Sequence, residues 1–115
     1  MTRESVARRY YELVDAGNYD ALVELFTETV VYERPGQATI EGRDALREFY
    51  EAGRPLSNGE HELHAVVAEG DTVAVRGTFR GEQDGDAVEL GFADFHEFDG
   101  ESIARRYTYT DRDTV

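Results

Sequence analysis

The amino-acid sequence predicts an α+β domain in which three helices, followed by an antiparallel meander of strands, cover one face of a curved sheet. Apolar residues recur at helical spacing over about the first fifty residues, and the pattern changes to alternation after residue 59. Gly and Asp turn signals divide the alternating half. No repeat or linker interrupts the 115 residues, so we expect residues 1–115 to form a single domain.

The first predicted helix spans Arg3 to Ala16. Thr2 stands at its N-cap position, where the hydroxyl can accept a hydrogen bond from a free backbone N–H, and Gly17 follows the last turn. The buried stripe of this helix is expected to contain Val6, Tyr10, Leu13 and Val14.

The next part of the chain predicts two more helices with a strand between them. Asn18 can cap the second helix. The apolar residues of that helix are Leu22, Leu25 and Phe26. Residues 28–34 have the composition of a strand that ends before Pro35, and a third helix is expected from about 43 to 52. Its buried residues are Leu46, Phe49 and Tyr50.

The second half of the chain predicts four strands joined by tight turns. The strands are expected at about 60–69, 72–81, 87–98 and 102–111. The turns between them carry Gly70-Asp71, Asp84-Gly85 and Asp99-Gly100. Such dipeptides favour hairpins, so the four strands should form an antiparallel meander.

The charge balance is strongly acidic. The chain has 25 acidic residues against 12 basic ones, all of them Arg, for a net charge of −13. An acidic surface without Lys is typical of a halophilic cytoplasmic protein, and we expect salt to stabilise it by screening like charges. The same field repels phosphate and anionic lipid, so neither nucleic acid nor a membrane is an expected partner. Without an apolar run of the length of a membrane span or a signal peptide, a cytoplasmic location is expected.

The sequence offers little for metal or thiol chemistry. It contains no cysteine, which excludes disulfides and thiolate ligands. His61 and His64 have the spacing H-x-x-H, but residues three apart on a strand point to opposite faces. We therefore expect neither a metal nor an organic cofactor.

The strand at 87–98 places two ionisable residues within an apolar stripe. One face of it carries Val88, Leu90, Phe92, Asp94, His96 and Phe98. Burial of a carboxylate is unfavourable unless the group is paired, hydrogen-bonded or protonated, so Asp94 is a candidate site residue. The alternative is a structural Asp94 that a Tyr hydroxyl or an Arg satisfies.

Tyr10 and Arg34 are further candidates. Tyr10 lies in the buried stripe of the first helix, where its hydroxyl either points into a cavity or bonds to a backbone group. Arg34 shares a strand face with Val30 and Tyr32. If that face is inward, Arg34 needs an anionic partner; a surface Arg34 beside Pro35 is the alternative.

The other face of the last three strands is low in charge within an acidic protein. Its residues are Ala74, Thr78, Ala93, Phe95, Ala104 and Thr108. Self-association would cover this face, so we expect a homodimer.

Four stretches that together cover most of the chain carry a family resemblance. They are R-Y-Y-E-L-V-D-A-G-N-Y-D-A-L-V-E-L-F (9–26), V-V-Y-E-R-P-G (30–36), E-G-R-D-A-L-R-E-F-Y (41–50) and F-A-D-F-H-E-F-D-G-E-S-I-A-R-R-Y-T-Y-T-D (92–111). The chain resembles the nuclear-transport-factor-two-like superfamily, and most nearly its SnoaL-like polyketide cyclases and ketosteroid isomerases. The resemblance implies a cone-shaped, barrel-like α+β domain with three N-terminal helices on a curved mixed, mainly antiparallel sheet. It also implies a deep apolar pocket and dimerisation through the outer sheet face.

The resemblance also suggests roles for individual residues. In ketosteroid isomerases a Tyr and a protonated Asp donate hydrogen bonds to an oxyanion beside a carboxylate base. By position, Tyr10 matches the donor Tyr and Asp94 the donor Asp, but the base is missing, because the family's E-D-P reads Glu33-Arg34-Pro35 here. Steroid isomerisation is therefore not expected, and Arg34 would pair with Asp94 or hold the carboxylate or enolate of a ligand.

Two functions follow from these candidates. The first is cofactor-independent proton transfer of isomerase, cyclase or hydrolase type on a small, partly apolar carbonyl compound. Asp94 and His96 would be its acid and base, with Tyr10 as oxyanion donor. Arg34 would anchor the ligand. The expected pocket lining is Tyr32, Phe49, Tyr50, Phe92 and Phe98.

The second function is that of a non-catalytic ligand-binding or dimeric interaction module with the same cavity. The pKa of Asp94 distinguishes the two. A raised pKa indicates a protonated donor, and a lowered pKa indicates an ion pair that holds the fold.

Overall fold

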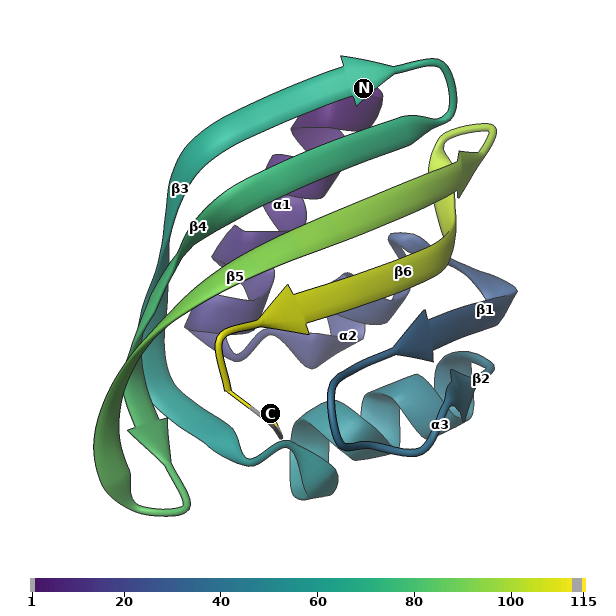
Figure 1. Ribbon diagram of the computed structural model, residues 1–115. Helices are drawn as coiled ribbons and strands as arrows, with labels where there is room; N and C mark the ends of the chain where they lie inside the picture. The colour runs from purple at the N-terminus through teal and green to yellow at the C-terminus, as the bar shows by residue number, and fades with distance from the viewer. Residues whose placement is uncertain (1, 113–114) are drawn as a thin grey trace.

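The structure is a computed structural model that describes residues 2–112 and 115, and it confirms the α+β class. Helices come first in the chain and cover one face of a single sheet, which curves around them (Figure 1). Within the described residues no helix is both long enough and apolar enough to cross a membrane.

The first helix, α1 (Arg3–Ala16), begins and ends where the sequence predicts. Thr2 Oγ1 accepts a hydrogen bond from the Ser5 N–H at 3.0 Å, which stabilises the start of the helix. Gly17 ends it with φ of 70°, a left-handed conformation that favours glycine. The buried face contains the predicted stripe and also Tyr11, which the sequence analysis did not single out.

The second helix, α2 (Tyr19–Val23), is shorter than predicted. Asn18 caps it by accepting a hydrogen bond from the Ala21 N–H at 3.3 Å. Phe26, which was expected in this helix, instead opens the first strand, β1 (Phe26–Glu33). A two-residue strand, β2 (Ile40–Glu41), pairs antiparallel with β1 and was not predicted, because two residues show no periodicity.

The predicted third helix divides into α3 (Arg43–Glu48) and a π-helical turn, η1 (Phe49–Gly53). Its three expected core residues are buried. The turn leads directly into Arg54 and the start of the long strands.

Four long strands complete the sheet: β3 (Leu56–Glu69), β4 (Thr72–Gln83), β5 (Asp86–Asp99) and β6 (Ser102–Thr110). They form the predicted antiparallel meander. The strand order is β2-β1-β6-β5-β4-β3, with β1 parallel to β6, so the sheet is mixed and mainly antiparallel. Because β2 and β3 are its two edges, the sheet is curved but not closed (Figure 1).

A β-bulge in β6 decides which of its side chains point toward the helices. Two residues of β6, Ala104 and Arg105, stand opposite the single residue Glu97. Beyond this extra residue the alternation is reversed, so that Arg106 and Thr108 are buried at 2% and 8% exposure. The prediction that Thr108 lies on the outer face is therefore wrong, because it assumed uninterrupted alternation.

The bend shared by β3 and β4 depends on close backbone approach at two glycines. A Cβ atom at Gly59 would lie 2.4 Å from the Arg80 carbonyl oxygen, and one at Gly77 would lie 2.2 Å from the Glu62 carbonyl oxygen. Side chains cannot come this close, so any larger residue would push the strands apart. The bend brings the start of β3 against the end of α1.

Candidate functional site

The inward face of β5 carries the predicted residues. Leu90, Phe92, Asp94, His96 and Phe98 are all buried, and Val88 is half-buried. A carboxylate and an imidazole thus lie inside the core, as the alternation predicts.

The carboxylate of Asp94 receives three hydrogen bonds from buried side chains. Oδ2 accepts one from the Tyr11 hydroxyl at 2.6 Å and one from Arg106 Nη2 at 2.8 Å. Oδ1 accepts the third from Thr108 Oγ1 at 2.7 Å. We call Tyr11, Asp94, His96, Arg106 and Thr108 the inner cluster.

The surroundings of Asp94 favour its ionised form. Burial raises the pKa of Asp94, but the charge of Arg106, with the Thr108 and Tyr11 hydrogen bonds, outweighs this and holds the pKa below its ordinary value. Asp94 is therefore a hydrogen-bond acceptor at neutral pH and not a donor. Its counter-ion is Arg106 and not Arg34, so the ion pair considered from the sequence is not formed.

Arg34 lies on the inward face of β1 with other partners. Its Nε donates to the main-chain oxygen of Val115 at 2.6 Å, and its Nη1 donates to the Tyr32 hydroxyl at 2.5 Å. The guanidinium carbon lies 4.8 Å from the centre of the Phe49 ring. Arg34 is thus buried, as one interpretation of the sequence required, and it binds oxygen atoms of the protein itself.

His96 is sealed in the core. Because the hydroxyl proton of Tyr11 goes to Asp94, His96 Nε2 must donate to the Tyr11 oxygen, 3.1 Å away. His96 Nδ1 then carries a lone pair, and no described residue donates to it. Burial and the charge of Arg106 lower the pKa of His96 to about 3, so the ring is neutral over the physiological range.

The Tyr10 hydroxyl is not among the three donors to Asp94. Its hydroxyl pairs with that of Tyr50 in a short hydrogen bond, and its ring lies 4.0 Å from the guanidinium carbon of Arg106. Burial raises the pKa of Tyr10, so its hydroxyl keeps its proton.

A small cavity lies next to the inner cluster. Its volume of about 20 Å³ is enough for one water molecule. The predicted site residues in its wall are Tyr10, Tyr32, Arg34, Phe92 and Asp94. The others, Phe49, Tyr50, His96 and Phe98, do not line it.

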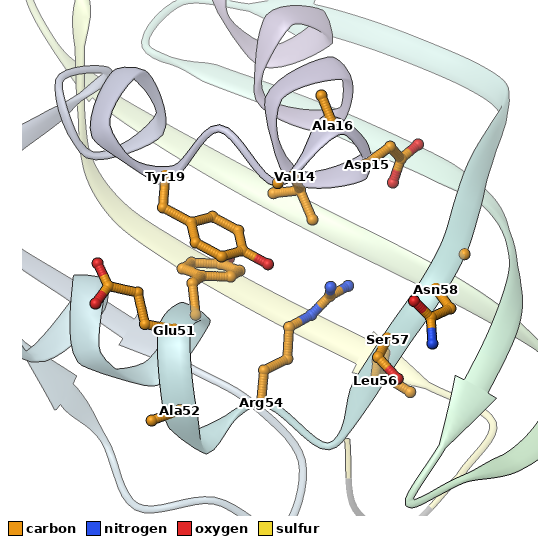
Figure 2. A pocket seen from close by; sticks show the side chains of 13 residues that line it. Val14, Asp15, Ala16, Tyr19, Glu51, Ala52, Arg54, Leu56, Ser57 and Asn58 are labelled. Atoms are coloured by element: carbon orange, nitrogen blue, oxygen red, sulfur yellow. The ribbon is translucent and has the colours of Figure 1, made fainter.

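A larger cleft opens between the end of α1, the turn η1 and the start of β3 (Figure 2). Its volume is about 370 Å³, and its walls are residues 14–17, 19, 50–52, 54 and 56–59. We call it the outer cleft. Arg54 and Leu56 line both this cleft and the inner cavity, so they stand between the two.

Arg54 is the cationic group in the wall of the outer cleft, which also contains the carboxylates of Asp15 and Glu51. Its side chain extends from the segment after η1 into the cleft, with Tyr19 on one side and Asn58 on the other (Figure 2). The guanidinium carbon lies 5.8 Å from the Tyr50 ring centre and 5.5 Å from that of Phe79. Within the part of the chain that the structure describes, Arg54 forms no ion pair, and its buried Nε has no hydrogen-bond partner.

Sequence analysis did not single out Arg54. The residue stands between Gly53 and Pro55, in a connection where no periodic pattern indicates which way a side chain points. Arg106 was missed for a related reason, since the bulge reverses the alternation of β6.

The two histidines of the H-x-x-H motif lie in different surroundings. His61 faces the inner cavity, whereas His64 is exposed and its Nε2 lies 2.9 Å from Thr78 Oγ1. Among residues 2–112 and 115, no group of three or more His, Asp or Glu side chains is placed to hold a metal ion.

A family model described as the SnoaL-like domain matches residues 7–106 of this sequence. The chain belongs to the SnoaL-like family. The match covers the helices except the first turn of α1, and most of the sheet, including the inner cluster up to Arg106.

Solved structures agree with this assignment of the SnoaL-like chain. An NTF2-like protein of unknown function from Burkholderia pseudomallei K96243 superimposes with a TM-score of 0.86 at 16% identity, over 96% of this chain and 92% of that one. A ketosteroid isomerase-like protein from Catenulispora acidiphila, crystallised with trimethylamine, gives 0.80 at 19% identity over 90% and 83%. The epoxide hydrolase/cyclase-like enzyme SalBIII, associated with pyran ring formation in salinomycin, gives 0.82 at 25% identity over 94% and 89%. The cone-shaped fold implied by the resemblance is confirmed.

Proposed function

We propose that this SnoaL-like protein binds a small molecule that joins a carboxylate to an apolar or aromatic body, and that the ligand occupies the outer cleft with its carboxylate on Arg54. The observation that carries the proposal is the state of Arg54. In a chain with 25 acidic residues, this half-buried guanidinium has no anionic partner among the described residues and faces an open cleft.

The chemistry of the cleft suits such a ligand. A guanidinium presents parallel N–H donors that match the two oxygens of a carboxylate. The rings of Tyr19 and Tyr50 stack at 5.8 Å between centres and form an aromatic wall beside Arg54. The volume of about 370 Å³ lies in the range of small-molecule sites.

Proton transfer by Asp94, His96 and Tyr10, the other function considered from the sequence, has less support. Asp94 is ionised with three donors bound to it, and His96 is neutral and outside the cavity wall. The adjoining cavity has room for one water molecule. A carbonyl compound would have to displace the ion pair to reach these groups.

The relatives are compatible with small-molecule binding in this fold. One neighbour was crystallised with trimethylamine, and another is described as an epoxide hydrolase/cyclase-like enzyme. The preference for an anion proposed here rests on Arg54.

Calorimetric titration with benzoate and with benzamide, its neutral analogue of the same shape, tests the proposal. Molar KCl in the buffer screens the net charge of −13 that would otherwise repel any anion. We expect benzoate to bind at least tenfold more tightly than benzamide, and Arg54→Gln to remove this preference.

Arg76→Gln is the matched control, since Arg76 is exposed on β4 away from the cleft. It should leave the affinity unchanged. Equal affinity of wild type and Arg54→Gln for benzoate, or no binding to wild type, would refute the assignment.

A further inference from the structure

The wall of the outer cleft carries opposite charges that do not pair with each other. Arg54 supplies the positive charge, and Asp15 and Glu51 supply carboxylates. In Figure 2 the Arg54 side chain extends toward the end of α1, which carries Asp15. Among the described residues, neither carboxylate forms an ion pair with Arg54. The cleft therefore offers separate partners for a negative and a positive group of one ligand.

Asp15 is the more firmly positioned of the two carboxylates. Its Oδ1 lies 2.6 Å from His61 Nδ1, and its Oδ2 accepts a hydrogen bond from the His61 backbone N–H at 2.9 Å. Each oxygen of a carboxylate has roughly two lone-pair sites, so each oxygen of Asp15 can still accept one more hydrogen bond. Glu51, in contrast, is half exposed and contacts Arg47, whose shorter ion pair is with Asp20.

The contact with His61 leaves the negative charge of Asp15 uncancelled. Burial lowers the pKa of His61 more than the hydrogen bond and the charge of Asp15 raise it, so the pKa stays below its ordinary value. His61 is therefore neutral at pH 7 and donates its Nδ1 proton to Asp15 without adding a positive charge. Asp15 remains an anion that needs a cationic partner.

The charge of the whole chain also favours a ligand without net charge. The net charge of −13 repels a ligand that carries only a carboxylate. An amino acid carries an ammonium group as well and has no net charge at neutral pH, so this repulsion is absent. An aromatic side chain on the amino acid would pack against the stacked rings of Tyr19 and Tyr50 in the cleft wall.

We infer that the ligand of the outer cleft is an aromatic amino acid, with its carboxylate on Arg54 and its ammonium group on Asp15. The inference rests on the proposed function and names the ligand class of that site. Both charged groups of such a ligand meet a partner of opposite charge, and both unpaired charges of the cleft wall are satisfied.

Calorimetric titration at pH 7 in molar KCl, with L-phenylalanine and with 3-phenylpropionate, tests this inference. The two compounds share the carboxylate and the ring, and 3-phenylpropionate lacks only the ammonium group. We expect phenylalanine to bind at least about tenfold more tightly to wild type, because the ammonium group forms a charge-assisted hydrogen bond. Asp15→Asn should reduce this ratio to less than about threefold and change the affinity for 3-phenylpropionate by less than about threefold.

Two control variants remove a carboxylate elsewhere. Asp99→Asn changes an exposed residue at the end of β5, outside the cleft wall, and should leave the affinity ratio unchanged. Glu51→Gln changes the other carboxylate of the cleft wall and should also preserve the ratio, because the inference assigns the ammonium group to Asp15.

The outcomes separate this inference from the proposed function. If wild type binds 3-phenylpropionate as tightly as phenylalanine, the inference is wrong and the proposed function stands, and this comparison requires no variant. An unchanged ratio in Asp15→Asn overturns the assignment of Asp15. Loss of 3-phenylpropionate binding in that variant overturns it too, since Asp15 would then support the cleft and not the ammonium group. If wild type binds neither compound and no benzoate, both proposals fall.

Discussion

The inner cluster and the junction between the outer cleft and the inner cavity each bring together one Asp, one Arg and one His, but the three groups are paired differently. In the inner cluster Asp94 pairs with Arg106, and His96 is left neutral with an unused nitrogen in the core. At this junction Asp15 pairs with His61, and Arg54 has no anionic partner among the described residues. The same residue types therefore form a closed ion pair in one region and a free cation beside an oriented imidazole in the other.

The difference shows that a charged group paired within the core stabilises the fold, whereas a charged group without a partner can bind a ligand. The buried carboxylate of Asp94 already has three donors and a counter-ion, and its role is to satisfy Arg106. Arg54, a half-buried cation in the wall of an open cleft, has the capacity to bind a ligand.

The largest expected effect concerns His96 and acid stability. Unfolded His96 takes up a proton below about pH 6.5, whereas the folded ring stays neutral down to about pH 3. In this interval the unfolded state binds more protons, so stability rises with pH and is lost as the pH falls. Over the whole interval the loss amounts to about 5 kcal/mol, or about 1.4 kcal/mol per pH unit.

Denaturant unfolding of wild type and His96→Gln at a series of pH values measures this term. The stability of wild type should fall more steeply below pH 6.5 than that of the variant. If the free energy of unfolding of both proteins changed with pH in parallel, folded His96 would accept a proton like an exposed histidine. The inner cluster would then not hold its imidazole neutral.

A slightly smaller effect is expected at Asp94. Asp94→Asn leaves Arg106 buried without a counter-ion and should lower the free energy of unfolding by about 3–5 kcal/mol. The second substitution Arg106→Met should recover part of the loss, whereas Arg34→Gln should add to it, because Arg34 does not contact Asp94.

Asp15→Asn, at a partly exposed pair, should change stability by no more than about 1 kcal/mol.

Thermal and denaturant unfolding at low and molar KCl completes this comparison. Salt should raise the melting temperature of wild type by screening the net charge of −13, while the buried coupling between Asp94 and Arg106 stays constant. Strict additivity of Asp94→Asn and Arg106→Met would contradict the ion pair.

The smallest expected effect on fold stability concerns the outer face of the sheet. We propose that the homodimer expected from the sequence forms through this face, where Phe95 and Tyr109 are 40% and 57% exposed with ring centres 6.0 Å apart. Phe95→Asp should convert a dimer to a monomer in light scattering and leave benzoate affinity unchanged, because the outer cleft lies on the helix side of the sheet. A monomeric wild type at micromolar concentration would contradict the proposal. Ala45→Asp adds the same charge at an exposed position on α3 and is the control, so it should leave the dimer intact.

The local features of this protein are predictable from short stretches of its sequence. The caps at Thr2, Gly17 and Asn18, and the inward face of β5 with Asp94 and His96, follow from hydrogen bonding and periodicity within a few residues. The family resemblance predicted the cone-shaped fold. The SnoaL-like match confirms the family, and the solved structures confirm the fold.

Which charged groups meet depends on long-range packing. A single extra residue in β6 turned Arg106 toward Asp94, and no propensity in the sequence indicates such a bulge. Asp15 and His61 are 46 positions apart and come together only because β3 bends against α1, with Gly59 giving room for Phe79. Burial and pairing energies depend on these long-range contacts, so whether an Asp, Arg or His is satisfied or free is a property of the packed molecule and not of its local sequence.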